Sequence, residues 1–492
     1  MQDERQVVVI GSGPAGATAA RELSQNGIPV AMLEAGTGFQ KGLLVRVAGK
    51  NLFRLTPPLH QEGGHSVSGD PRTLCWAKLA LGGLSNNWTG AVPRFAPEDF
   101  TEGERLHERF RWPITYSDLA PYYDKVEPSL EITADPRDVP QMPGGYASYR
   151  CRLPSDWQDV ERSANRFGQG FTTYPLADGA PNILVRRGTA FNSYACIVRP
   201  LLQLPNFRLH TGAHALQLQW SATKRKVDGV IYFNRRTGQT ERLGASAVVV
   251  ACGPLASTKL LHNSVSSDFP QGLGNSREVL GRFLHDHPRE WWSFQLDRPL
   301  SLLAPSAYLT RLPYHTSPPL MATSWTLGTV NAQDRIRSRF GLKGTAVGVQ
   351  MIGTMIPSQG CFAMPSATKK DEFGLPTLDV CIRYSDDEVQ NVVRARQHLM
   401  TLMDDAGCRA TMGRTFDTLY PGTIAHYGGS ARMHAEPKYG VVDAWNRVYD
   451  APNVLVCDAA CFTTTPEKNP TLTVMAIAAR AATRLAHDLK HG

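Results

Sequence analysis

A glycine-rich turn, Gly-Ser-Gly-Pro-Ala-Gly, occupies residues 11–16. It follows a short apolar run at residues 6–10 and precedes a segment predicted to be helical, residues 18–26. Glycines in this setting let the backbone approach a pyrophosphate, which the helix N-terminus attracts. Glu34 ends the next apolar run, where a carboxylate suits ribose hydroxyls. The predicted dinucleotide contacts are Gly11, Gly13, Pro14, Ala15, Gly16, Glu34 and Ala35; an NAD site, or a turn without ligand, remains an alternative.

A second glycine-rich segment, Leu-Gly-Gly-Leu-Ser-Asn-Asn-Trp-Thr-Gly, spans residues 81–90. Its two adjacent glycines permit close approach of the backbone to a flat ring, and the small polar residues after them can donate hydrogen bonds to ring heteroatoms. A plain turn has the same composition and stays an alternative. The predicted ring contacts are Gly82, Gly83, Ser85, Asn86, Asn87, Trp88 and Thr89.

Near the C-terminal end, polar residues again stand beside predicted strands and helices. Asp458 ends an apolar strand and is placed to bond ribityl hydroxyls, while Pro470 suits the first turn of the last helix with Asn469 as its cap. A helix N-terminus at the pyrimidine edge of a flavin would stabilise negative charge on the reduced ring. His426 is a candidate base, although a structural histidine is the simpler interpretation. For Asn469 the simpler interpretation is a plain N-cap. Further predicted cofactor contacts are His214, Ala215, Ala251, Gly253, Ala459 and Thr471.

The elements that must position these residues predict an α/β fold with two domains. A Rossmann-type FAD-binding domain is interrupted by an inserted α+β substrate domain built on a mainly antiparallel sheet, since successive strands occur without helices between them. The expected parts of the FAD-binding domain are residues 1–115, with loops over the cofactor, residues 181–284 and residues 425–492. Residues 116–180 are expected to form a substrate or lid segment, and residues 285–424 the substrate-binding domain.

Several individual elements are expected within this plan. A capped helix should begin within residues 112–127, with Ser117 or Asp118 as cap and Pro121 in its first turn. Helices are also expected at residues 190–202, 386–406 and 471–490. A hairpin should turn at residues 236–239. The strands of the inserted sheet are expected within residues 291–296, 306–310, 319–327, 346–356 and 377–385.

Composition excludes other classes of protein. The chain has 492 residues, 20% of them charged, and a formal net charge of +8. This excess is mild for the length and lacks dense basic blocks, so no nucleic-acid partner is expected. The nine cysteines contain no CxxC pair, which favours reduced thiols over disulfides or a metal site. We find no leader segment and no apolar run of membrane-spanning length, so we expect a cytoplasmic protein with no membrane partner.

Together these segments resemble the glucose–methanol–choline (GMC) oxidoreductase family. The resemblance extends over the glycine loop with Glu34, residues 81–90, 112–127, 248–261 and 281–288, and the C-terminal segments from His426 to the last helix. It implies FAD as cofactor and oxidation of an alcohol by hydride transfer to flavin N5. It further implies that His426 takes the hydroxyl proton and that Asn469 holds the same oxygen, roles that imidazole and amide groups suit.

Within the family the chain resembles the pyranose-oxidase-like branch and the bacterial glycoside 3-oxidases. Covalent members of that branch carry the flavin on a histidine of the second loop, and Asn87 stands at the matching position. The resemblance therefore implies non-covalent FAD. His285 and His287, the rival bases, are interpreted as structural.

The implied substrate is a small-molecule alcohol, a sugar or glycoside, with oxygen or another electron acceptor. Trp291, Trp292 and Trp325 are candidate sugar-stacking residues, although core packing is the simpler role for them. The open alternatives are a dehydrogenase acting on an aminoglycoside or other glycosylated natural product, a sterol or long-chain alcohol oxidase, and a non-catalytic flavin-binding protein.

Overall fold

The computed structural model describes residues 6–38, 60–61, 66–67, 70–135, 139, 142–153, 155–177, 179, 191–296, 307–309, 323–327, 345–414 and 421–491. The loops expected over the cofactor at residues 36–110 therefore lie partly outside the described residues. The same holds for residue 190, where a helix was expected to begin, and for the ends of the strands expected at 306–310 and 319–327.

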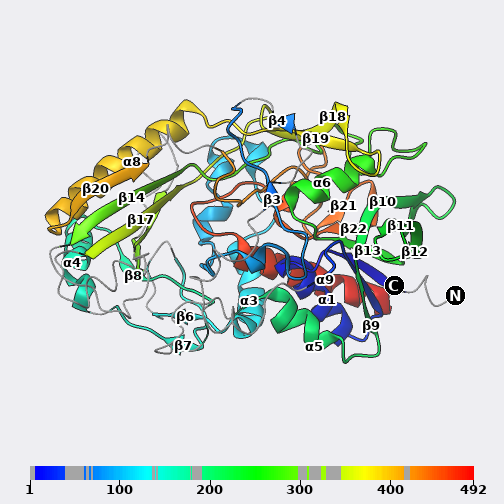
Figure 1. The fold of residues 1–492 in the computed structure, drawn as a ribbon, viewed down its shortest axis with the longest axis horizontal. Coiled ribbons are helices and arrows are strands. Elements are labelled where there is room, and N and C mark those ends of the chain that lie inside the picture. Colours follow the sequence, from blue (N-terminus) through cyan, green and yellow to red (C-terminus); the bar gives the residue numbers. More distant parts are fainter. Residues whose placement is uncertain are drawn as a thin grey trace.

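The main sheet joins segments from both ends and the middle of the chain (Figure 1). All neighbours in it run parallel except the antiparallel edge strand β21. Its central strands β1 and β13 are fully buried runs of Val, Ile and Ala, as expected of a parallel sheet covered on both faces. The strand order is β21 (Arg447–Val448), β22 (Ala451–Val456), β13 (Ala247–Val250), β1 (Val7–Ile10), β2 (Val30–Glu34) and β9 (Phe207–Thr211).

Helices α1 (Pro14–Gln25), α3 (Tyr116–Val126) and α9 (Thr471–His491) pack together beside this sheet. Small buried residues such as Ala17 and Ala20 of α1 and Ala478 and Ala482 of α9 share one hydrophobic core with the strands. Because α1 and α9 each begin at the carboxyl edge of the sheet, both N-termini point towards the same region. This is the region where doubly wound folds bind ligands.

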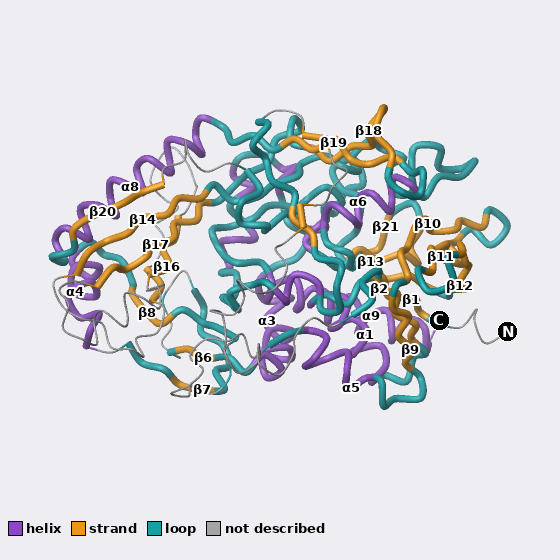
Figure 2. The backbone as a smooth tube through the Cα atoms, in the orientation of Figure 1, coloured by secondary structure: helices purple, strands orange, loops and turns teal. Residues whose placement is uncertain are grey.

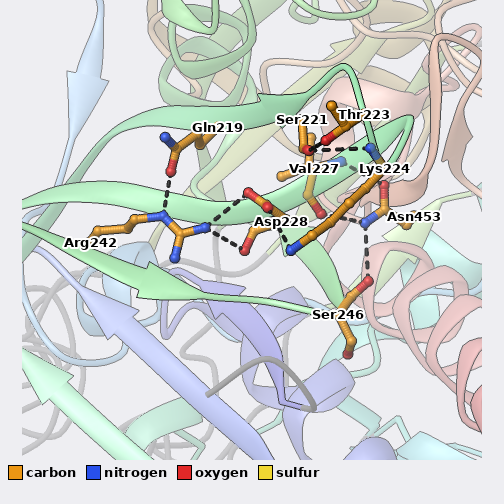
Figure 3. Close-up of polar contacts among 9 residues, drawn as sticks. All are labelled: Gln219, Ser221, Thr223, Lys224, Val227, Asp228, Arg242, Ser246 and Asn453. Atoms are coloured by element: carbon orange, nitrogen blue, oxygen red, sulfur yellow. Dashed lines mark hydrogen bonds and ion pairs between the residues drawn. The ribbon is translucent and has the colours of Figure 1, made fainter. Parts of the chain in front are cut away.

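A three-stranded antiparallel meander, β10 (Ala213–Ser221), β11 (Lys226–Asn234) and β12 (Gln239–Gly244), confirms the expected hairpin. Asn453 fastens the meander to the main sheet by donating through Nδ2 to the carbonyls of Val227 (2.7 Å) and Ser246 (3.0 Å) (Figure 3). Asp228 accepts from Arg242 at 2.9 Å across the meander. These contacts hold the end of β10 near Trp220, whereas its start at Ala213 borders the cavity described below.

The inserted sheet is antiparallel, as predicted, and lies at the opposite end of the molecule (Figures 1 and 2). Helices α4 (Gln158–Arg166) and α8 (Asp386–Asp405) cover it, and α8 begins with a capping box between Ser385 and Glu388. Its strand order is β20 (Arg409–Arg414), β14 (Arg289–Leu296), β17 (Thr345–Gly353), β16 (Thr323–Leu327), β15 (Ala307–Leu309) and β8 (Phe171–Thr173).

The strand expected at residues 377–385 does not belong to this sheet. It forms β19 (Pro376–Cys381) in a separate three-stranded sheet with β18 (Phe362–Lys370) and β4 (Ser66–Val67). The two-residue alternation identifies a strand but not its partner. Edge strands β8 and β20 complete the inserted sheet instead, and they come from outside the run that the sequence singled out.

Two helix predictions need correction. Thr115, not Ser117, caps α3 through a capping box with Asp118, and Pro121 lies inside the helix rather than in its first turn. The helix expected at residues 190–202 begins only near Ser193, as a π-helical turn (Tyr194–Val198) followed by α5 (Arg199–Leu201). Helix α6 (Pro254–Asn263) follows β13.

The remaining elements are short. Two-stranded pairs are formed by β3 (His60–Gln61) with β5 (Trp76–Ala77) and by β6 (Thr133–Ala134) with β7 (Tyr149–Arg150). In the described part of the chain, no helix combines the length and apolar character needed to cross a membrane. The 3₁₀ turns are Gly83–Asn86, Pro97–Phe100, Gly103–Arg105, Glu108–Phe110, Glu127–Leu130, Ser155–Trp157 and Ala459–Cys461.

Candidate active site

An elongated cavity of about 420 Å³ opens at the carboxyl edge of the main sheet, beside the N-termini of α1, α6 and α9. It brings together segments from the whole chain, from the glycine turn to the start of α9. The predicted site residues that line it are Gly11, Gly13, Pro14, Ala15, Glu34, Ala35, Gly83, Ser85, Asn87, Trp88, Thr89, His214, Ala215, Ala251, Gly253, His426, Asp458, Ala459, Asn469, Pro470 and Thr471.

The glycine turn has no room for side chains at two of its three glycines. Gly11 has φ of +100°, and a Cβ there would lie 2.4 Å from the carbonyl oxygen of Ala251. A Cβ on Gly16 would lie 2.0 Å from the carbonyl oxygen of Gly11, so Gly16 serves close packing of the helix and does not itself line the cavity. At Gly13 a Cβ would meet nothing within 4 Å. The turn therefore leaves open backbone at the helix N-terminus for an anion.

Glu34 holds the glycine turn in this shape. Its carboxylate accepts hydrogen bonds from the backbone N–H of Ser12 (3.0 Å), the Ser12 hydroxyl (2.5 Å) and the N–H of Gly36 (2.8 Å). Burial raises the pKa of Glu34, and the bonds from Ser12 and Gly36 oppose that rise. The predicted ribose contact stays a prediction, and the structure adds a supporting role for Glu34 in the turn.

The second glycine-rich segment is attached to the first by hydroxyl groups. The Ser12 hydroxyl accepts from the N–H of Gly82 at 2.9 Å, and the Ser193 hydroxyl donates to the Ser12 carbonyl at 2.8 Å. Asn86 donates to the carbonyls of Leu81 and Gly83 within its own loop. Gly82 and Asn86 do not line the cavity, so the structure gives them a supporting place rather than the predicted contact.

Asn87 lines the cavity and has a side-chain oxygen without a hydrogen-bond donor among the described residues. Its Oδ1 is buried and accepts no hydrogen bond from the described residues. A buried acceptor left without a donor is costly, so it favours a ligand that supplies one. Trp88 is fixed beside it by an edge-on contact with Phe191 and by a bond from its indole N–H to the Phe191 carbonyl at 3.3 Å.

Asp458 ties the C-terminal segment to β13 and α6. One oxygen accepts from the N–H of Gly253 (2.9 Å) and the hydroxyl of Ser257 (2.5 Å), and the other accepts from the N–H of Ala460 (2.8 Å). Burial raises the pKa of Asp458, and these three bonds counter the rise. Asp458 lines the cavity together with the glycine turn and His426.

His426 and Asn469 meet at the far end of the cavity, although the sequence separates them by 43 residues. Asn469 Nδ2 lies 3.2 Å from His426 Nε2. The Asn469 side chain is not the cap of α9: its Oδ1 accepts from the Tyr174 hydroxyl, and the helix begins at Thr471 after Pro470, whose carbonyl accepts from Val474 at 2.9 Å. The predicted cap and the predicted place of Pro470 in the first turn are thus corrected, because tertiary contacts engage Asn469.

The surroundings of His426 keep its imidazole neutral. Burial lowers its pKa well below 6.5, and neighbouring His287 and Arg289 lower it further. Asp286 accepts from the His426 backbone N–H at 3.1 Å, and the His287 ring meets the His426 ring edge-on at 5.1 Å between centroids. A neutral imidazole with Nε2 facing the cavity has the state required of a general base.

His285 and His287 lie outside the cavity lining, and the His287 ring contacts the His426 ring. Each Nδ1 faces a backbone carbonyl, that of Phe283 at 2.9 Å and that of Gly353 at 3.2 Å, and neither histidine lines the cavity. Burial lowers the pKa of His285 to about 4 and that of His287 to about 3. The geometry supports the interpretation of both as structural residues.

A hairpin loop between β18 and β19 also borders the cavity, through Asp371 and Leu375. Its Asp371 forms an ion pair with Lys259 of α6 at 2.8 Å, and its Phe373 ring lies 4.8 Å from the His214 ring. Although burial disfavours the charged carboxylate, Lys259 holds the pKa of Asp371 below its ordinary value. Sequence reasoning missed this contact, since nothing local in the loop marks a partner more than 100 residues away.

The tryptophans proposed for sugar stacking are placed elsewhere. Trp291 and Trp292 lie on β14 outside the cavity, and Trp292 packs against Gly413 and donates to Glu290 at 3.1 Å. The side chain of Trp325 lies outside the described residues. Trp76 and Trp88 are the tryptophans that line the cavity in the described part of the chain.

The residues present fit FAD. The open turn at Gly13 with the N-terminus of α1 suits the pyrophosphate, the unpaired Asn87 Oδ1 suits a ring N–H donor, and the cavity extends from Glu34 to His426. Backbone N–H groups at the start of α9 suit the pyrimidine edge of the flavin, because they would stabilise negative charge on the reduced ring.

Comparison with known families agrees with this geometry. Two family models described as GMC oxidoreductase match residues 56–289 and 358–478, and a model described as pyridine nucleotide-disulphide oxidoreductase matches residues 5–62. The match over residues 5–62 covers the glycine turn and Glu34, and the match over residues 358–478 covers both His426 and Asn469.

Similar proteins span nearly the whole chain. A 6'''-hydroxyparomomycin C oxidase from Streptomyces lividus is 29% identical and a paromamine 6'-oxidase from Streptomyces fradiae 28% identical, each over 98% of this chain and 91% of the relative. A C-glycoside 3-oxidase from Microbacterium trichothecenolyticum is 23% identical over 98% of this chain and 96% of the relative.

The fold also matches a solved structure. Pyridoxine 4-oxidase from Mesorbium loti superimposes with a TM-score of 0.70 at 17% identity, over 98% of this chain and 99% of that one. Fold, cavity and family models therefore agree, and the chain belongs to the GMC oxidoreductase family, as an FAD-dependent enzyme that oxidises CH–OH groups.

Proposed function

We propose that this enzyme oxidises a secondary hydroxyl of a sugar or glycoside to a ketone. The observation that carries the proposal is the 3.2 Å pair of Asn469 Nδ2 and His426 Nε2 at the end of the cofactor cavity. The relatives named as oxidases of C-glycosides, 6'''-hydroxyparomomycin C and paromamine support the substrate class.

The pair has the polarity of a hydroxyl receptor. An alcohol oxygen placed between the two groups would accept from Asn469 Nδ2 and donate its proton to the neutral His426 Nε2. His426 would take that proton as the C–O bond becomes a carbonyl, while Asn469 would keep the oxygen in place. When bound, FAD supplies the acceptor for the hydride that leaves the carbinol carbon.

We further propose that FAD is held without a covalent bond. Asn87 occupies the loop position at which a histidine would be the attachment point, and a carboxamide is not nucleophilic enough to replace it. The glycine turn, Asp458 and the hairpin loop with Asp371 would retain the cofactor by contacts alone.

The test is anaerobic bleaching of the bound flavin by monosaccharides, O- and C-glycosides and aminoglycosides. We expect His426→Ala to keep its flavin and to be reduced about 10²- to 10⁴-fold more slowly, the range for loss of a general base. His398→Gln, a change on α8 away from the cavity residues, is the control and should behave as wild type.

Each outcome is informative. Reduction of His426→Ala at wild-type speed would remove His426 from the mechanism. A flavin that no substrate bleaches would favour the non-catalytic flavin-binding protein. Oxygen uptake with peroxide formation after substrate addition would identify an oxidase, and reoxidation only by added quinone would identify the dehydrogenase alternative.

A further inference from the structure

We infer that Tyr174 is a positioning residue that sets which way the Asn469 carboxamide faces. The inference rests on the proposed roles of His426 and Asn469 and extends them to a side chain outside the cavity lining. The Tyr174 hydroxyl donates to Asn469 Oδ1, which turns the amide Nδ2 towards His426 Nε2 at 3.2 Å.

The orientation matters because a carboxamide has one donor end and one acceptor end. With Nδ2 facing it, His426 Nε2 is held as an acceptor, and the imidazole proton resides on Nδ1. A flipped amide would present Oδ1 to the imidazole instead. That acceptor would stabilise a proton on Nε2 and would raise the pKa of the base.

Burial and packing hold the Tyr174 ring in place. It is 3% exposed and packs in a small apolar cluster with Ala91, Val139, Met142 and Leu176. It directly follows β8, the edge strand of the inserted sheet, so a segment attached to that sheet supplies the group that orients the Asn469 amide.

The experiment compares Tyr174→Phe with wild type as holoenzymes. The rate of anaerobic flavin reduction is measured against pH, with the most effective substrate of the panel. We expect unchanged flavin content, reduction about three- to tenfold slower at the plateau, as for one lost hydrogen bond, and an acid limb displaced to higher pH by about half a unit to one unit. Asp286, His287 and Arg289, which face His426 from the neighbouring segment, stay unchanged in the variant.

Tyr123→Phe is the matched control. Its hydroxyl is also buried, and it bonds Thr473 of α9 at 2.8 Å without contacting the pair. We expect that variant to keep the wild-type acid limb, because it removes a buried tyrosine hydroxyl that contacts α9 but leaves the orientation of the Asn469 amide unchanged.

A Tyr174→Phe enzyme with the wild-type rate and acid limb would overturn the inference, while slow His426→Ala would still support the proposed function. If Tyr174→Phe lost its flavin or its fold, 3-fluorotyrosine at position 174 would replace it. That residue keeps the ring and is the stronger donor, so the acid limb should move to lower pH, and an unmoved limb would refute the inference equally.

Discussion

A buried ion cluster around Lys468, the residue before Asn469, leads to a specific prediction about stability. Lys468 Nζ lies 2.6 Å from Asp99 Oδ2 and 3.1 Å from Glu467 Oε1, and all three side chains have 0% exposure. Asp99 also accepts from the N–H of Ala96 at 2.6 Å. The cluster therefore anchors the residue next to Asn469 to the 3₁₀ turn at Pro97–Phe100.

Lys468→Met keeps the length of the side chain and removes its charge. Two buried carboxylates then lose their shared cation, and breaking such a contact costs about 3–5 kcal/mol. We expect that loss in the free energy of unfolding, measured by urea denaturation at fixed FAD concentration with tryptophan fluorescence as the signal. Flavin reduction should slow as well, since Asn469 is the next residue.

Two further variants make this prediction refutable. Asp99→Asn in the Lys468→Met background should recover part of the lost stability, because one uncompensated charge is removed while a bond to Ala96 is retained. Lys438→Met breaks an exposed pair with Glu436, both side chains at least 50% exposed, and should leave the free energy of unfolding close to the wild-type value. A Lys468→Met effect as small as this control would refute the reasoning.

Three other expectations concern the cofactor and pH. Because Asn87 offers no attachment, acid precipitation should leave the yellow flavin in the supernatant; colour in the pellet would contradict this. Asp371→Asn, which breaks the Lys259 pair, should raise the FAD dissociation constant about fivefold in apoenzyme titrations; Asp228→Asn, at a position that does not line the cavity and lies at the other end of the meander from His214, is the control, and equal constants for the two variants would be contrary evidence. Burial raises the pKa of Asp286 to about 7, so its contribution to stability is lost as pH rises from about 4 to 7, and Asp286→Asn should show a flatter unfolding free energy across that range, not the wild-type slope.

The parts of the fold that local sequence determines were predicted well. The strand–turn–helix with Gly11 and the strand ending in Glu34 is a local unit, since backbone sterics and one helix N-terminus define it. The expected antiparallel insertion and the helix at 386–406 also agree with the structure. Here local pattern and tertiary environment favour the same conformation.

The errors occur where a distant partner decides. Asn469 beside Pro470 has the pattern of an N-cap, yet its carboxamide is engaged by Tyr174, 295 residues earlier. Trp291 and Trp292 alternate correctly along a strand, but alternation does not say which face meets a ligand. Likewise Ser193 and Asp371 contact cavity loops from segments that contain no recognisable motif.

The two sheets affect the proposed active site in different ways. Gly11, Glu34 and Asp458, which are predicted to contact the dinucleotide, lie at strand ends of the main sheet, whose geometry is set by its own core. Tyr174 instead follows β8, which among the described strands of the inserted sheet pairs with β15 alone, Phe171 opposite Leu309. A change in the inserted sheet that shifts this edge strand would move the hydroxyl that orients Asn469. Remodelling of the inserted sheet would then alter the basicity of His426 without any substitution in the proposed catalytic pair itself.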